Sequence, residues 1–166
     1  MRPLPTLLAA VLVAPLAACG ADAGAIDVSV TGPDDVTLSA ASRLTLSIYG
    51  YDTRIADQSA TLIRTRVEPI TALPVVVSVA LPDDALARVD PTVGGDLAAN
   101  VRFYLAGVDV DVDGDGAICP GELTQDFGPD GPLVFGVDGP GGPLAIPMTV
   151  LGDPGCVDPF PDGQRP

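Results

Sequence analysis

Residues 44–49, Leu-Thr-Leu-Ser-Ile-Tyr, decide the fold class, because apolar side chains occupy every second position. Successive side chains of an extended strand point to opposite faces, so this period of two predicts a strand with one buried face. The same alternation recurs along the chain. The further candidate strands are residues 26–31, 63–68, 74–81, 100–110, 133–137 and 144–151. About seven short strands with polar outer faces predict an all-β fold, an antiparallel β-sandwich.

Clusters of Gly, Pro and Asp separate the candidate strands, as at residues 32–35 and 139–143. These residue types favour turns. Pro147 interrupts the last candidate strand and has no N–H to donate, so it predicts an edge strand or a bulge. Residues 83–89 are compatible with a helical turn. We therefore expect one β domain over residues 26–152, followed by an irregular tail over residues 153–166.

The composition excludes several classes of function. The chain has 166 residues, enough for one domain with a real core, and its net charge is −14. Such a field repels nucleic acid, so we expect no nucleic-acid partner. Histidine is absent, which excludes catalytic triads that use an imidazole base and the usual zinc and copper sites. The 18 prolines and 19 glycines argue against a helical bundle.

The first 18 residues have the pattern of a leader. A charged start at Arg2 is followed by an apolar stretch over residues 7–14, which Pro15 interrupts, and then by the tetrad Leu16-Ala17-Ala18-Cys19. An apolar run of this length is too short for a comfortable membrane-spanning helix. The segment is therefore interpreted as a cleaved signal peptide.

The tetrad resembles the lipobox of bacterial lipoproteins. That resemblance implies cleavage before Cys19 and attachment of acyl chains, palmitate among them, to this cysteine. Residues 19–25 would then be a short tether, and the protein would be held at the membrane by its lipid. Gly20 stands where some lipoproteins carry an Asp that retains them in the inner membrane, so the resemblance implies the outer membrane. The alternative is an ordinary signal peptide followed by a chance cysteine.

The most specific local signal is residues 111–122, Asp-Val-Asp-Gly-Asp-Gly-Ala-Ile-Cys-Pro-Gly-Glu. Calcium takes many oxygen ligands at about 2.3–2.6 Å, and a twelve-residue loop supplies them from positions 1, 3, 5, 7 and 12. The predicted ligands are Asp111, Asp113, Asp115, the carbonyl of Ala117, and Glu122. A loop that started at Asp109 would have Pro120 at position 12, without a carboxylate. The register that starts at Asp111 is therefore favoured.

These twelve residues resemble the EF-hand calcium loop, with Gly116 at the position of the sharp turn. The segment before the loop has the pattern of a strand, so the incoming helix of that family is missing. Similar Asp-x-Asp-x-Asp-Gly loops occur in unrelated folds, and the resemblance therefore indicates an ion rather than a family. Without a helix pair to reorient, a structural calcium is favoured over a switch. The alternative is an acidic hairpin that binds no ion.

If Cys19 carries lipid, two cysteines remain, Cys119 and Cys156. An even number of thiols in an oxidising envelope predicts one disulfide. The bond would close a loop of about 38 residues and attach the tail to the calcium loop. Two free thiols are the alternative, whereas a softer metal at Cys119 is disfavoured because the neighbouring ligands are hard oxygens.

Two functional hypotheses follow. The favoured one is a non-enzymatic, calcium-stabilised envelope lipoprotein that binds a protein partner or supports the envelope. The alternative is a small hydrolase that uses paired carboxylates. The only glutamates are Glu68 and Glu122, and most aspartates lie in turns, where solvation keeps them ordinary acids. Arg64 and Arg66 share a strand face with Glu68; a solvated face paired with nearby Asp is favoured over a ligand site.

Overall fold

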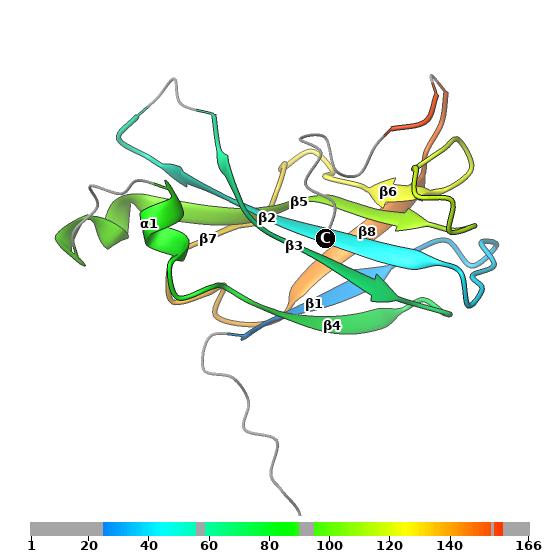
Figure 1. Cartoon of the computed structure of the whole chain (residues 1–166), viewed down its shortest axis with the longest axis horizontal. Helices are drawn as coiled ribbons and strands as arrows, with labels where there is room; N and C mark the ends of the chain where they lie inside the picture. The colour runs from blue at the N-terminus through cyan, green and yellow to red at the C-terminus, as the bar shows by residue number, and fades with distance from the viewer. Residues whose placement is uncertain (1–24, 56–58, 90–94, 154, 158–166) are drawn as a thin grey trace, which may run out of the picture.

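The computed structural model describes residues 25–55, 59–89, 95–153 and 155–157. The predicted leader, Cys19 and most of the predicted tail therefore lie outside the described residues. The described residues form eight strands, a short α-helix and a 3-10 helix. Figure 1 shows how these elements are arranged. The elements are β1 (Ala25–Thr31), β2 (Arg43–Asp52), β3 (Thr61–Pro69), β4 (Val75–Ala80), α1 (Ala85–Val89), η1 (Gly95–Asn100), β5 (Val101–Asp111), β6 (Leu123–Gln125), β7 (Val134–Phe135) and β8 (Leu144–Val150).

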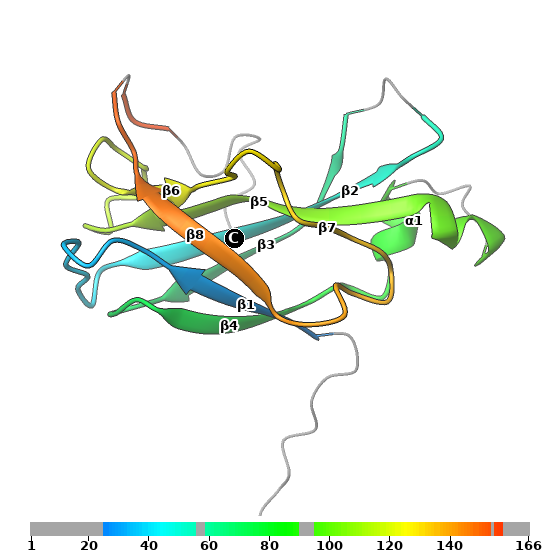
Figure 2. The same cartoon turned by 180° about the vertical axis from the view of Figure 1, so that it is seen from behind.

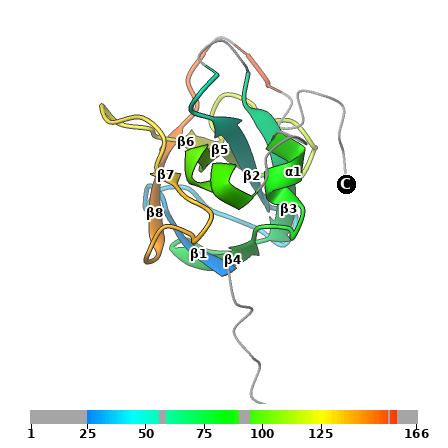
Figure 3. The same ribbon diagram turned by 90° about the vertical axis from the view of Figure 1, so that its left-hand side faces the viewer.

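The strands follow one hydrogen-bonded path in the order β3-β2-β5-β6-β8-β1-β4, and β7 pairs with β5. The path curves round on itself into a nearly closed, barrel-like arrangement, which the end view shows (Figure 3). The predicted all-β fold is confirmed. One pairing departs from an antiparallel meander, because β1 and β8 run parallel, with Val28 opposite Leu144.

The core follows the predicted alternation. In β2 and β5 the apolar side chains at every second position are fully buried: Leu44, Leu46, Ile48, Val101, Phe103 and Leu105. In β2 the intervening Thr45 and Ser47 are buried as well, so the predicted polar outer face is covered there. At Gly107, whose φ is +62°, the alternation of β5 shifts by one residue, and Val108 and Val110 are buried beyond it. A bulge of this kind lets both halves of a long strand bury their apolar face.

Gly50 allows α1 to approach β2. A Cβ atom at this position would lie 2.6 Å from Cγ2 of Val89, the last residue of α1. Residues 83–89, which the sequence left compatible with a helical turn, contain α1, and this helix covers one end of the core (Figure 1). No helix among the described ranges is long and apolar enough to cross a membrane.

Pro147 corrects the expectation that the last strand lies at an edge. From behind, β8 crosses the barrel between β6 and β1 (Figure 2). Residues 144–147 pair with β1, and residues 148–150 pair with β6. Pro147 thus stands where one ladder ends and the other begins, and its carbonyl accepts a hydrogen bond from the N–H of Asp126 at 2.9 Å. Because Pro147 lies where β8 changes its partner strand from β1 to β6, the N–H that proline lacks is not needed for a continuous ladder.

Strands β3 and β4 end the path, and two arginines of β3 reach across to β4. Arg64 donates to the carbonyl of Ala80 at 3.0 Å, and Arg66 donates to the carbonyl of Ser78. Arg66 also pairs with Glu68 on its own strand. The sequence interpretation, which paired these arginines with nearby Asp, therefore named the wrong partners. The described bonds of Arg64 and Arg66 connect the two edge strands instead.

Candidate metal centre

The loop of residues 111–122 connects two neighbouring strands. Strand β5 ends at Asp111 and β6 begins at Leu123, and the two strands are antiparallel with Val110 opposite Leu123. The pairing holds the two ends of the loop side by side. The segment that enters the loop is a strand, as its alternation predicts, and not the helix of an EF-hand.

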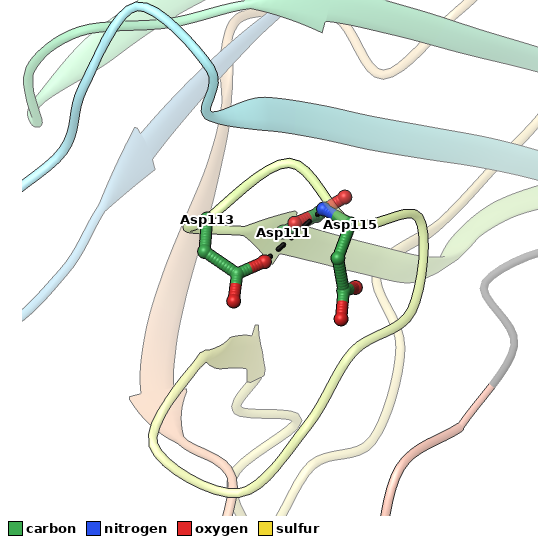
Figure 4. A group of neighbouring side chains, drawn as sticks. All are labelled: Asp111, Asp113 and Asp115. Atoms are coloured by element: carbon green, nitrogen blue, oxygen red, sulfur yellow. Dashed lines mark hydrogen bonds between the residues drawn. The ribbon is translucent and has the colours of Figure 1, made fainter.

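Three of the predicted ligands gather in this loop. Carboxylate oxygens of Asp111, Asp113 and Asp115 lie within 4.8 Å of one another (Figure 4). Calcium binds oxygens at about 2.3–2.6 Å, so two of its ligands are at most about 5 Å apart. The three carboxylates therefore fit the coordination shell of one hard cation. Asp111 is buried at the base of the loop, and Asp113 and Asp115 are exposed.

The carboxylate of Asp111 holds the sharpest part of the loop. Its Oδ1 accepts a hydrogen bond from the N–H of Gly114 at 2.6 Å, and its Oδ2 accepts one from the N–H of Gly116 at 2.8 Å. Both glycines have left-handed φ angles, +80° and +90°. A Cβ at Gly114 would also lie 2.7 Å from the carbonyl oxygen of Ala41. The backbone course of the loop thus requires glycine at Gly114 for two reasons.

The carboxylates of Asp113 and Asp115 each accept a hydrogen bond from the backbone N–H two residues further along the loop. Asp113 accepts a hydrogen bond from the N–H of Asp115 at 3.1 Å, and Asp115 accepts one from the N–H of Ala117 at 2.8 Å. These bonds orient the carboxylates toward the same region, and the predicted carbonyl ligand Ala117 follows directly. Like charges this close repel each other, so a bound dication would stabilise the arrangement.

Glu122 does not join this group of carboxylates. It is buried, and its Oε1 accepts hydrogen bonds from the N–H of Val112 at 2.5 Å and of Asp113 at 3.3 Å. Its Oε2 accepts one from the N–H of Cys119 at 2.7 Å. A carboxylate has about four acceptor positions, and these N–H groups occupy three of them. Glu122 therefore fastens the start of the loop to its end, a role that the sequence analysis did not assign.

The disulfide between Cys119 and Cys156 is present, as predicted. Beside it, Ile118 and Val157 form an antiparallel bridge with N–H to carbonyl distances of 2.8 and 2.7 Å. Ile118 is fully buried. The described end of the chain is thus joined to the loop by a covalent bond and a pair of backbone hydrogen bonds.

Asp109, the start of the competing register, lies inside β5. Its carboxylate accepts a hydrogen bond from the hydroxyl of Thr124 on β6 at 2.7 Å. Burial raises the pKa of the Asp109 carboxyl above its ordinary value, and the bond from Thr124 acts in the opposite direction. Asp109 therefore links the two strands that carry the loop.

A cluster that the sequence analysis did not single out contains all three tyrosines of the chain. The rings of Tyr49 and Tyr104 stack with centroids 5.7 Å apart, and Tyr51 meets Tyr104 edge-on at 6.0 Å. Burial raises the pKa of Tyr104, and Tyr51 adds to this shift. The three tyrosines alternate with core positions on β2 and β5. The sequence does not predict the pairing register of these two strands, which places Tyr49 opposite Tyr104.

Comparisons with known proteins found little. No protein-family model matches the chain, and no curated protein matches it. A solved structure of an alternative pilotin from the type II secretion system of Vibrio cholerae is similar, with a TM-score of 0.43 and 18% sequence identity. The match covers 79% of this chain and 97% of that chain. This similarity is too low to assign a family or a function.

Proposed function

We propose that the protein is a non-enzymatic lipoprotein of the cell envelope, stabilised by calcium at residues 111–122, that binds a protein partner. The observation that carries the calcium site is the convergence of three carboxylates within 4.8 Å on one short loop. The lipobox-like tetrad around Cys19 supports the lipid anchor. The outer membrane is the proposed location, on the basis of Gly20.

The calcium is proposed to be structural rather than regulatory. Pairing of β5 with β6, the bonds to Glu122 and the disulfide at Cys119 all hold the loop at its ends. The ends of a loop fixed in this way have little freedom to move when an ion binds, and they are attached to strands rather than to a pair of helices. Binding would therefore order the acidic tip and stabilise the fold without a large rearrangement.

Calcium is expected to raise the melting temperature of the wild-type protein. A dissociation constant of about 0.1–1 mM is typical of extracellular modules, and calcium at ten times that value adds about 1.4 kcal/mol. The expected rise in Tm is about 3–8 °C by calorimetry. Asp113→Ala should abolish this rise. Because Asp113 is exposed and accepts one described backbone bond, its loss should cost less than about 1 kcal/mol in chelator.

Asp35→Ala is the matched control, since Asp35 is an exposed aspartate in a turn outside the loop. It should keep the full response to calcium. A wild-type protein that shows no rise in millimolar calcium, or an Asp113→Ala variant that responds like the wild type, would refute the calcium site.

Replacing Cys19 by Ser is expected to release the protein from membranes. The hydroxyl of serine does not accept the thioether-linked lipid that the lipobox implies, and acyl chains supply the proposed anchor. The measurement is fractionation of cells followed by extraction with salt and with detergent. A Cys19→Ser protein that still requires detergent for extraction would contradict the lipid anchor.

The carboxylates of the described residues support a non-enzymatic role. Hollows in the surface are lined by Asp27 and Asp138, by Asp126 and Asp130, and by Asp83, all of which are exposed. Two buried carboxylates lie outside these hollows. Asp52 accepts hydrogen bonds from Arg54, and these bonds lower the pKa of Asp52. Asp109 accepts a hydrogen bond from Thr124. A hydrolase that uses two carboxylates needs a facing pair in a cleft. These arrangements favour the binding hypothesis.

A further inference from the structure

Apolar side chains are exposed beside the outer face of β8. Phe127 is 41% exposed and Leu133 is 43% exposed. Together with Ala145 and Pro147 of β8 they line a hollow of about 210 Å³, which we name the β8 groove. Phe127 and Leu133 thus give this hollow an apolar surface that an aliphatic side chain could cover.

An acidic hollow adjoins the β8 groove. It has a volume of about 300 Å³ and is lined by Asp27 of β1, Asp138 and residues 139–143. Pro143, which lines the acidic hollow, lies two residues before Ala145, which lines the β8 groove. Asp27 lies on β1, which is paired in parallel with β8 with Val28 opposite Leu144.

Charge defines what fits this surface. The charged residues that line the two hollows are Asp27, Asp126, Asp130 and Asp138, so the described part of the lining contains carboxylates and no basic side chain. A cationic group would be attracted here, and an anionic membrane surface would be repelled. The apolar surface of the β8 groove and the carboxylates around it together fit a ligand that carries both a cationic and an apolar side chain.

We propose that the β8 groove and the acidic hollow bind an extended segment of a protein partner, with an aliphatic side chain in the groove and a Lys or Arg side chain in the acidic hollow. This proposal rests on the partner-binding function proposed above and gives the partner's chemistry. Side chains two residues apart lie on the same side of an extended chain, about 7 Å from each other. The recognition element is therefore an aliphatic residue with a basic residue two positions away.

The segment would be recognised through its side chains. Residues 144–147 of β8 pair with β1 and residues 148–150 pair with β6, so neither edge of β8 is free along its whole length for an added strand. Its outward-facing residues, Ala145 and Pro147, are exposed. The bound segment would lie across this face, where the strand backbone below it is rigid.

The probe is a fluorescein-labelled peptide, Ser-Lys-Ser-Leu-Ser-Lys-Ser, which places a Lys two residues from Leu in either chain direction. Its binding to the full chain in neutral detergent is measured by fluorescence anisotropy. Matched peptides replace both Lys by Glu, or Leu by Ala. We expect saturable binding of the first peptide that weakens as salt rises, and at least tenfold weaker binding of the other two.

The variants separate the two parts of the surface. Phe127→Ser combined with Leu133→Ser should raise Kd at least tenfold, and Asp27→Asn combined with Asp138→Asn should raise it about threefold and reduce its dependence on salt. Val76→Ser on β4, at a residue that is 65% exposed and outside both hollows, is the control and should leave Kd unchanged. Thermal unfolding of each variant confirms that it is folded.

Equal binding of the Glu peptide, absence of saturable binding below 1 mM, or unchanged Kd in the groove variants would overturn the proposal. Binding to phosphatidylcholine vesicles that the groove variants abolish, without peptide binding, would assign the surface to lipid instead. Crosslinking in intact cells separates this failure from that of the proposed function. A partner captured equally by wild type and groove variants leaves the function standing and refutes this surface, whereas a wild type that captures no specific partner refutes the function.

Discussion

Replacing Glu122 by Gln is expected to lower the free energy of unfolding by about 1–3 kcal/mol, in chelator as well as in calcium. The buried carboxylate accepts hydrogen bonds from the backbone N–H groups of Val112, Asp113 and Cys119. A Gln side chain has one acceptor oxygen and presents its own N–H groups to these donors. At least one of the three N–H groups would therefore lose its acceptor. Each buried donor without an acceptor costs about 1–3 kcal/mol. Urea unfolding measures the loss.

The other glutamate of the chain supplies the control. Glu68 pairs with Arg66 on the partly exposed face of β3, where an ion pair contributes about 0–1 kcal/mol. Glu68→Gln should therefore have a small effect. If Glu122→Gln were as stable as the wild type in chelator and lost only its response to calcium, Glu122 would act as a metal ligand rather than as a fastening of the loop.

Removing the disulfide is expected to lower the free energy of unfolding by about 3–4 kcal/mol. The bond joins cysteines 37 residues apart, so it restricts a long segment of the unfolded chain. The protein with Cys119→Ser and Cys156→Ser is compared with the wild type in urea, with and without a reducing agent. Reduction should lower the stability of the wild type to that of the double variant and leave the double variant unchanged.

Val150→Ser serves as the control for this experiment, because Val150 is 42% exposed at the end of β8 and takes no part in the disulfide. It should stay within about 0.5 kcal/mol of the wild type. A double variant that loses less than about 1 kcal/mol would show that the backbone bridge between Ile118 and Val157 holds the end of the chain without the covalent bond.

The strands were predictable where alternation runs over several residues. Residues 44–49 lie within β2 and residues 63–68 within β3. Their alternation of apolar and polar residues indicated a strand because successive side chains of a strand point to opposite faces. Strand β6 was missed, since Leu123, Thr124 and Gln125 are too few to define a period. Residues 133–137 contain only the two-residue β7.

The loop was predictable in its residue types but not in the roles of all its side chains. Spacing along the chain placed Asp111, Asp113 and Asp115 together, because neighbours in a short loop cannot be far apart. The same spacing made Glu122 a ligand. Whether a carboxylate faces an ion or backbone N–H groups depends on which donors the fold places beside it, and Glu122 lies next to three.

The sequence by itself determined the strand character of the chain and the acidic loop, because these follow from local alternation and short spacing. It predicted the pairing of Cys119 with Cys156 once Cys19 was assigned to the lipid. Only the tertiary structure decided that β1 lies parallel to β8, that the three tyrosines meet and that Asp27 and Asp138 line one hollow. The physical reason is that contacts between distant segments depend on how all the apolar faces are buried at once, which no short stretch of sequence specifies.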